Sequence, residues 1–427
     1  MNGKGRILCS AFCDALALVS VAAFSLILIA SLLARTGMPF IPAYTCGMLA
    51  SIVGTLAVSH GGRTLIALPS PAITAWLVYE EIIAHGLLWQ ELLGVAAVVS
   101  LIGAVLFRTK AAVTWTAALP SIVRTGLVFG LGLAMLTTAA LYTRILLPSP
   151  WALTMGGTLA DPLTYYALVG TLLALLLHAR GIRSAALPLG MGIIAMLTWC
   201  EGFWEVPAAP FLEPELLPTA LALIPPQAKE ILPIAALGVT LLLALAVESA
   251  AVLAACVEEA DTSTERMTLA RLFTVGGAAA LLGAFPLTVA PLSAALPTQT
   301  EDRRIAGIPL TAWLSALLLG LLLPCAPLMQ ALADFPVVPA IALAVSGLLL
   351  IARALTALKR EHTDFTLREG VVMAVFALAV YDIQTGFTAA LLLWTGLTAA
   401  RGERDRIPCG TWILTAVLLS FALLKQL

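Results

Sequence analysis

The sequence is poor in charged residues and in histidine. Of its 427 residues, 11% are Asp, Glu, Lys or Arg, and 4 are histidines. Soluble globular proteins carry roughly a quarter charged residues, so this composition excludes a soluble protein. The formal net charge is -1. Because a chain without a basic excess offers no electrostatic surface to phosphate backbones, we expect no nucleic-acid partner.

Motifs that carry metal or enzyme chemistry are also missing. The 7 cysteines are scattered, and they form neither a Cys-x-x-Cys pair nor a metal-binding spacing with histidine. The sequence has no HExxH, GxSxG or P-loop motif. Gly190, Gly192 and Ala195 match a dinucleotide-binding pattern, but without a βαβ context such small residues are typical of closely packed membrane helices. We therefore expect no metal, no cofactor and no enzymatic activity.

Long apolar runs are what the sequence does contain. Hydrophobic residues make up 61% of the chain, and the mean hydropathy is +1.02. Runs of about 20 apolar residues, long enough to cross ~30 Å of hydrocarbon, recur along the whole chain. They predict an all-α polytopic membrane protein with about fourteen transmembrane segments, some of them short or broken. The first run reaches Leu33 without a cleavage site, so we interpret it as a span and not as a signal peptide.

The distribution of basic residues predicts an orientation. Lys and Arg collect at the N-terminus and in several short loops, whereas the linker Cys200–Glu230 is acidic and rich in proline. Because cytoplasmic loops carry the excess of Lys and Arg, we expect both termini in the cytoplasm and the linker outside. The linker separates two halves of about seven spans, and an odd number of spans inverts the second half. The sequence thus predicts two inverted repeats in a multi-pass protein of the cell (inner or plasma) membrane.

Proline interrupts one apolar segment in each half. The segments are ALPSPAITAWL, Ala67–Leu77, and GAFPLTVAPLSAALPTQ, Gly283–Gln299; pairing Pro69 with Pro291 gives an offset of 291 - 69 = 222 residues. Proline ends a regular helix, so each segment is predicted to be a half-helix joined to extended chain. Such backbone persists at membrane depth only where it is buried in protein or lines a cavity. Two breaks in matching places predict the central site of a transporter, although two kinked helices without a ligand would give the same pattern.

Glu248 lies deep in an apolar segment, ILPIAALGVTLLLALAVESAAVLAAC (Ile231–Cys256). An ionisable side chain at that depth costs at least ~2.5 kcal/mol and marks a functional site by default. We therefore predict that Glu248 binds the coupling proton of a transport cycle. The alternative is a structural acid that pairs with a neighbouring span or reaches toward the end of the segment near Glu258.

Three segments resemble signatures of one transporter family. They are TGMPFIPAYTCGMLASIVGTLAV (Thr36–Val58), LPSIVRTGLVFGLGLAML (Leu119–Leu136) and YDIQTGFTAALLLW (Tyr381–Trp394). Over nearly its whole length the chain resembles the nucleobase cation symporter family 2, the xanthine/uracil permease superfamily, and most closely its adenine/guanine/hypoxanthine permease branch. The resemblance implies two inverted repeats that each contribute to a core domain and to a gate domain. The implied domains are a first core part at 11–107, a first gate part at 118–200, an extracytoplasmic linker at 201–230, a second core part at 231–328, and a second gate part with a C-terminal hydrophobic segment at 329–427.

The chain departs from that branch at the expected substrate site. Thr74 replaces an asparagine, and Leu292 stands where the branch has a second glutamate. Trp76 follows the first break and could offer its ring face to a flat heterocycle. The substrate-binding residues that we expect from the resemblance and from the first break are Glu248, Ser249, Thr74, Trp76, Ser70, Thr288 and Ser293.

The main functional hypothesis is secondary active transport, with proton-coupled uptake of a purine or related nucleobase. The expected partners are this small-molecule substrate, a proton and the lipid bilayer, and a homodimer remains open. One alternative is transport of another small molecule, or of an anion attracted to the N-termini of the half-helices, on the same fold. Another is a membrane sensor or enzyme that kept the fold without transporting. The pattern leaves open whether residues 411–424 span the membrane or lie along its surface.

Overall fold

The structure is a computed structural model of the whole chain. It describes residues 3–109, 119–148, 154–182, 185–217, 231–256, 262–295, 304–361, 366–379 and 383–424. Residues 218–230 of the linker, and Tyr381 and Asp382 of the third family-like segment, lie outside the described residues. In the described part, 8 helices are long and apolar enough to cross a membrane. Together with shorter apolar helices and two broken segments, they confirm the predicted all-α polytopic membrane fold.

Helices dominate both halves of the chain, and the strands are two or three residues long. The first half contains α1 (Gly3–Ala34), α2 (Phe40–Ser59), β1 (Ala67–Pro69), α3 (Pro71–Trp76), the π-helix η1 (Leu77–Ala84), α4 (Trp89–Leu106), α6 (Ser121–Tyr142), β2 (Leu146–Pro148), β3 (Thr154–Gly156), α7 (Pro162–Ala179) and α8 (Ala186–Cys200). The second half contains α9 (Ile231–Cys256), α10 (Thr262–Leu281), β4 (Leu287–Val289), α11 (Leu292–Ala295), β5 (Arg304–Ile305), β6 (Ile308–Pro309), α12 (Leu310–Leu322), the 3-10 helix η3 (Leu323–Cys325), α13 (Ala326–Asp334), α14 (Val337–Glu361), α15 (Leu367–Leu378), α16 (Ile383–Ala400), the 3-10 helix η4 (Arg404–Arg406) and α17 (Cys409–Leu424).

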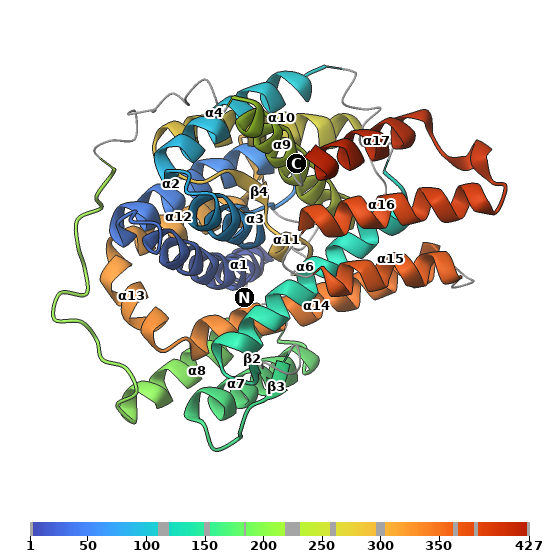
Figure 1. Cartoon of the computed structure of the whole chain (residues 1–427). Helices are drawn as coiled ribbons and strands as arrows, with labels where there is room; N and C mark the ends of the chain where they lie inside the picture. The colour runs from blue at the N-terminus through green and yellow to red at the C-terminus, as the bar shows by residue number, and fades with distance from the viewer. Residues whose placement is uncertain are drawn as a thin grey trace.

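Helices from the two halves pack against each other in pairs. In Figure 1, α6 and α14 run side by side, and α15 and α16 lie next to them. Elsewhere, α10 packs against α2 and α4, while α1 packs against α2 and α12. Apart from the contacts of α1 with α2 and of α15 with α16, these contacts join the first half of the chain to the second. The two halves are therefore interleaved and do not form separate domains along the chain.

Two glycines allow the close contact between α6 and α14. A Cβ atom at Gly132 would lie 2.9 Å from the carbonyl oxygen of Gly347, and a Cβ atom at Gly347 would lie 2.6 Å from the carbonyl oxygen of Gly132. Both distances are too short for a side chain, so the two backbones meet directly. Of the glycines noted in the sequence, Gly190 lies against Ala174 of α7, whereas Gly192 faces open space.

We expect Gly347→Ala to destabilise the protein by ~1–3 kcal/mol, the usual effect of overpacking, because the obstructing atoms belong to the backbone of α6. Thermal unfolding of the detergent-solubilised protein measures this as a lower melting temperature. Gly192→Ala is the matched control, since nothing lies within 4 Å of the new Cβ atom and alanine favours the helix. Equal melting temperatures for the two variants would contradict the close contact.

The two proline-interrupted segments cross at the centre of the protein. Strands β1 and β4 pair antiparallel, with Ala67 opposite Val289 and Pro69 opposite Leu287. Each strand leads into a short helix, α3 or α11. This confirms the prediction of extended segments at both breaks. Strand β1 begins at Ala67 and its counterpart β4 at Leu287, an offset of 287 - 67 = 220 residues. With this offset, Pro291 corresponds to Pro71. The sequence comparison paired Pro291 with Pro69, which is wrong by two residues.

Hydroxyl groups from neighbouring helices satisfy the irregular backbone at this crossing. A buried N–H group without a partner would be costly, and the crossing strands have few strand neighbours to supply one. The backbone N–H groups of three residues therefore donate to side-chain oxygens: Ala67 to Thr55 (3.2 Å), Ile66 to Ser293 (2.9 Å) and Val289 to Ser249 (3.3 Å). The hydroxyls hold the two breaks in place.

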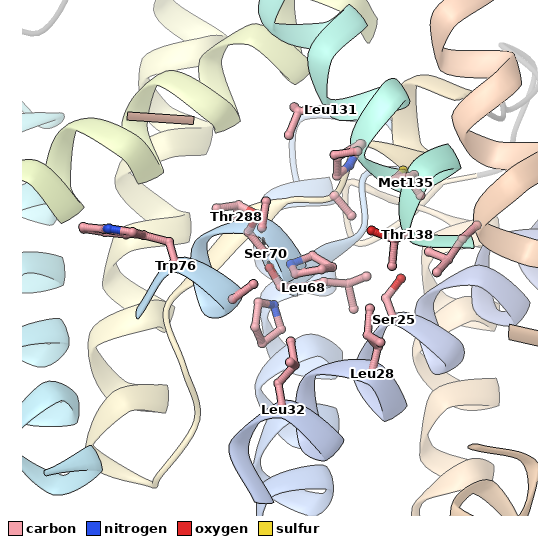
Figure 2. Close-up of a pocket in the computed structure, with 18 of the residues that line it drawn as sticks. Ser25, Leu28, Leu32, Leu68, Ser70, Trp76, Leu131, Met135, Thr138 and Thr288 are labelled. Carbon is pink, nitrogen blue, oxygen red and sulfur yellow. Dashed lines mark hydrogen bonds between the residues drawn. The ribbon is translucent and has the colours of Figure 1, made fainter. Parts of the chain in front are cut away.

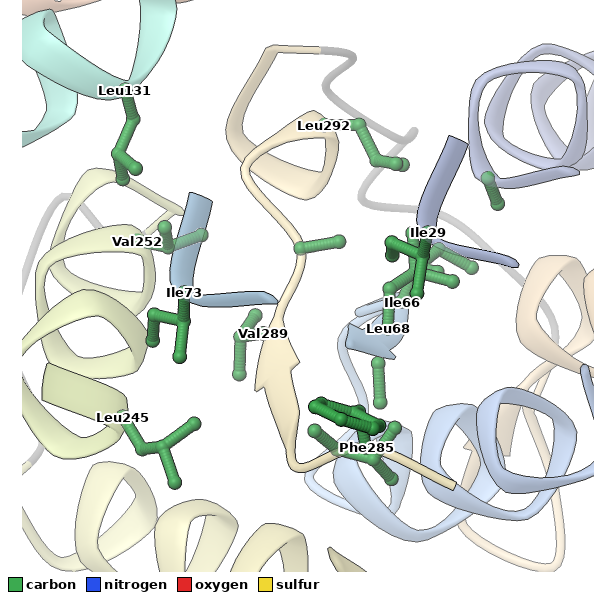
Figure 3. Close-up of a cluster of buried hydrophobic side chains, with 14 of the residues drawn as sticks. Ile29, Ile66, Leu68, Ile73, Leu131, Leu245, Val252, Phe285, Val289 and Leu292 are labelled. Atoms are coloured by element: carbon green, nitrogen blue, oxygen red, sulfur yellow. The ribbon is translucent and has the colours of Figure 1, made fainter. Parts of the chain in front are cut away.

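Apolar side chains surround the crossing on both sides. Figure 3 shows Val289 of β4 between Ile73 and α9 on one side and Leu68 of β1 on the other. All three of these side chains are at most 3% exposed. These buried apolar side chains pack closely around the crossing and stabilise it. The site described next therefore rests on a close-packed base.

Candidate functional site

A cavity of about 480 Å³ lies between the crossing and helix α6. One wall is formed by α1 and by the β1–α3 and β4–α11 segments, and the opposite wall by α6. Figure 2 shows Leu131, Met135 and Thr138 of α6 facing Ser25 and Leu28 of α1 across this space. The cavity thus joins the two interrupted segments to a helix from another part of the bundle.

Glu248, on α9, is one of the residues that line this cavity. Its side chain is 0% exposed, yet it contributes to the cavity wall. The hydroxyl of Ser70 donates to its Oε2 atom at 2.9 Å, and the hydroxyl of Thr288 lies 3.3 Å from its Oε1 atom. Ser70 comes from the first interrupted segment and Thr288 from the second. One carboxyl group therefore ties both breaks to α9.

Thr288 has two acceptors within reach and one proton to donate. Its Oγ1 atom lies 3.3 Å from the carbonyl oxygen of Leu68 and 3.3 Å from Oε1 of Glu248. A hydroxyl donates one hydrogen bond at a time. When Thr288 donates to Leu68, the contact with Glu248 is a hydrogen bond only if the Glu248 carboxyl group carries a proton and donates to Thr288. The geometry can accommodate both protonation states of Glu248.

The seven residues expected from the sequence fall into two groups. Glu248, Ser70, Thr288 and Trp76 line the cavity. Ser249 and Ser293 accept backbone hydrogen bonds in the crossing, and Thr74 is 2% exposed and does not line the cavity. In Figure 2 the Trp76 ring extends from α3 to the side away from α6. Leu292, at the position of the family's second glutamate, lines the cavity with an apolar side chain.

Residues on α1, α6 and η1 complete the cavity and were not expected from the sequence. They include Ser25, Met135 and Thr138, and, on the π-helix, Tyr79 and Glu80. Most are apolar or carry one hydroxyl, so in the sequence they cannot be told from residues that face lipid. Glu80 did carry a signal, because it is an acid within an apolar segment.

A π-helix continues α3 on the far side of Trp76. Along η1 the backbone widens, as π-helical turns often do at functional sites. Tyr79 is 46% exposed and accepts a hydrogen bond of 2.9 Å from Arg35 Nη1. At the C-terminal end of η1, His85 Nδ1 lies 3.3 Å from Glu81 Oε2. Of the residues on η1, Tyr79 and Glu80 line the cavity, whereas Glu81 is buried.

No metal centre is apparent in the part of the chain that the structure describes. Within those residues, no group of three or more His, Cys, Asp or Glu side chains is placed to hold a metal ion. The polar side chains among the lining residues carry carboxyl, hydroxyl, phenol and indole groups.

Comparison with known proteins places the fold. No protein-family model and no curated protein sequence matches the chain. The transmembrane domain of a cyanobacterium bicarbonate transporter, BicA, matches with a TM-score of 0.59 and 17% identity over 90% of this chain and 97% of that one. The chain shares its fold.

Two further solved structures agree with this fold. SLC26A9 matches with a TM-score of 0.54 and 14% identity over 91% of this chain and 65% of that one. The murine Solute Carrier 26 family member A9 anion transporter, in the inward-facing state, matches with a TM-score of 0.50 and 10% identity over 92% and 68%. The fold of these proteins is the inverted repeat of seven plus seven helices. The resemblance to the nucleobase cation symporter family 2 is therefore supported at the level of the fold, which the two groups share.

Proposed function

We propose that the chain is a secondary active transporter that moves one small solute together with a proton. The observation that carries this proposal is Glu248, a carboxyl group that is 0% exposed, lines the central cavity and bonds to both interrupted segments. An ionisable group in such a place is costly and serves transport in other membrane proteins. The proton on Glu248 is the coupling ion.

The contacts of Glu248 explain how proton binding could be coupled to solute binding. Thr288 donates to the ionised carboxylate in one state, and accepts from the protonated carboxyl group while donating to Leu68 in the other. A solute in the cavity that favours one of these arrangements changes the affinity for the proton, and the proton changes the affinity for the solute by the same factor. This reciprocity is what a symporter requires.

We propose that transport moves one group of helices against another. The cavity lies where α6 faces the crossing of β1 and β4, so relative movement of these walls would open the cavity to alternate sides. In this proposal α1–α4 and α9–α12 form the core, and α6–α8 and α14–α17 form the gate, as the family resemblance implies. Alternating access in inverted-repeat transporters works by such rigid-body movements around a fixed site.

Two classes of solute are candidates. The structural neighbours carry bicarbonate or other anions according to their descriptions, which favours a small anion. The sequence resemblance instead favours a nucleobase, and the cavity of about 480 Å³ has room for one. Of the two, we favour the anion, because the solved structures that share the fold are described as bicarbonate or anion transporters. In addition, Thr74 and Leu292 depart from the nucleobase branch at its expected substrate site.

Binding to the folded state raises its stability, so a thermal-shift screen of the purified protein tests both classes. The panel contains hypoxanthine, uracil, bicarbonate and formate, and each compound that raises the melting temperature is then tested for uptake into proteoliposomes under an imposed pH gradient. Gradient-driven uptake of any member supports a transporter. Uptake that does not respond to the pH gradient would contradict proton coupling.

We also propose that both termini are cytoplasmic and that the linker is outside. Cysteine labelling is expected to show this: in a background without the 7 native cysteines, Glu213→Cys should react with an impermeant maleimide in intact cells. Glu213 is exposed, so the reagent can reach it. The matched control is Arg404→Cys, an exposed position that should react only after lysis. The reverse labelling pattern would invert the topology.

A further inference from the structure

We infer that the cavity admits its substrate only without net negative charge, either as an uncharged solute or as an acid that carries its proton, and rejects permanently charged anions. The inference rests on the proposed transport function and narrows its substrate class. It would allow a small anion to be carried together with the coupling proton, but not alone.

Acidic side chains are the charged groups of the cavity wall. Among the described residues that line it, Glu80 and Glu248 are acidic, and none is Lys, Arg or His. Coulomb repulsion acts over several ångströms when it is not screened by water, and the buried position of Glu248 limits that screening. When Glu248 is ionised, an anion inside the cavity therefore meets like charge, and no described residue of the cavity wall is basic.

The backbone at the two breaks does not compensate for this. Helix N-termini bind anions through free N–H groups, but α3 starts with Pro71, and Pro291 precedes α11; neither proline has an N–H group. The N–H of Ile73 donates to Ser70 Oγ at 3.3 Å, and the N–H of Ser293 donates to Ala290 O at 2.9 Å.

Three of the hydroxyl donors in the cavity are also engaged with the protein. Ser70 donates to Glu248, Thr288 lies between two acceptors, and Ser25 donates to the carbonyl oxygen of Val21 at 2.9 Å. An anion would have to compete with these contacts. A protonated acid or an uncharged solute can instead both donate and accept, and so fits a wall of carboxyl and hydroxyl oxygens.

Two basic side chains lie next to η1. Arg35 is exposed and binds the Tyr79 hydroxyl, and His85 lies beside Glu81. Neither Arg35 nor His85 lines the cavity. Water and salt screen charges at an exposed position, so these groups do not turn the interior into an anion site.

Charged thiol reagents test this selectivity without knowledge of the natural substrate. Ala75 is partly buried and lines the cavity, so Ala75→Cys in a cysteine-free background places one reactive thiol there. Glu213→Cys on the exposed linker is the reference. The detergent-solubilised variants are treated with 2-sulfonatoethyl methanethiosulfonate, an anion, and with 2-(trimethylammonio)ethyl methanethiosulfonate, a cation of similar size. The ratio of the anionic to the cationic rate is compared between the two sites.

We expect this ratio to be roughly tenfold lower at Ala75→Cys than at the reference, because like charge repels the anion. Adding Glu80→Gln and Glu248→Gln together should raise the ratio toward the reference; if that variant does not fold, Glu80→Gln alone should raise it in part. Glu91→Gln is the matched control and should leave it unchanged, since Glu91 lies outside the cavity lining and its bond to the Leu88 N–H survives as an amide.

A ratio at Ala75→Cys equal to or above the reference would overturn the inference while leaving the proposed transporter intact. If neither these reagents nor the small neutral reagent methyl methanethiosulfonate reacts at Ala75→Cys, the cavity does not admit solutes, and the proposed function fails together with the inference.

Discussion

Replacing Glu248 with glutamine is expected to abolish solute uptake driven by a proton gradient, down to the level of liposomes without protein. The amide keeps the size of the side chain and can still bond to Ser70 and Thr288, but it cannot take up or release a proton. Solute binding should change by less than about tenfold, because an isosteric exchange of one hydrogen-bonding group alters binding by less than ~1.4 kcal/mol. Thermal shift measures binding, and proteoliposomes measure uptake.

Glu91→Gln provides the matched control for this experiment. It makes the same chemical change on α4, outside the cavity lining, and should transport like the unmodified protein. Undiminished gradient-driven uptake by the Glu248→Gln variant would mean that Glu248 has a structural role. Loss of binding together with uptake would instead place Glu248 in direct contact with the solute.

Filling the cavity should abolish both binding and transport. Ala75→Trp adds a large ring to the cavity wall on α3, and that ring occupies space in a cavity of about 480 Å³ between the crossing and α6. Because Ala75 is only partly buried, the new ring can enter the cavity without displacing packed core atoms. We expect no thermal shift with any member of the panel and uptake equal to that of liposomes without protein.

A tryptophan at a surface position controls for the size and hydrophobicity of the substitution. Val98 lies on α4 and is 58% exposed, so Val98→Trp adds the same ring away from the cavity. This variant should bind and transport normally. If Ala75→Trp transports as well as Val98→Trp, the solute takes another route through the protein.

The sequence was sufficient to predict the breaks and the buried acid. Proline has definite effects on backbone geometry, so two prolines within each apolar run predicted extended chain joined to half-helices. The depth of Glu248 in an apolar segment predicted a buried carboxyl group by the same kind of local argument, and its role in proton binding stays a prediction. The correspondence between the halves was wrong by two residues, because spacing does not distinguish Pro69, which ends a strand, from Pro71, which begins a helix.

Contacts between distant segments could not be predicted in this way. Ser70 and Thr288 are 218 residues apart (288 - 70), and only the antiparallel pairing of β1 and β4 brings both to Glu248. Thr74 was expected at the site, but the turn of α3 buries it away from the cavity. The wall formed by α6 gave no signal either, because Leu131 and Met135 have the same apolar character as residues that face lipid.

Proton entry coupled to solute entry is the most direct measurement of the proposed mechanism. Proteoliposomes that contain the pH-sensitive dye pyranine, with equal pH on both sides, are exposed to each compound that raised the melting temperature, and liposomes without protein give the background. We expect the solute to acidify the lumen in a saturable way with the unmodified protein, and not with Glu248→Gln. Saturable, protein-dependent solute entry without acidification of the lumen would contradict proton coupling at Glu248.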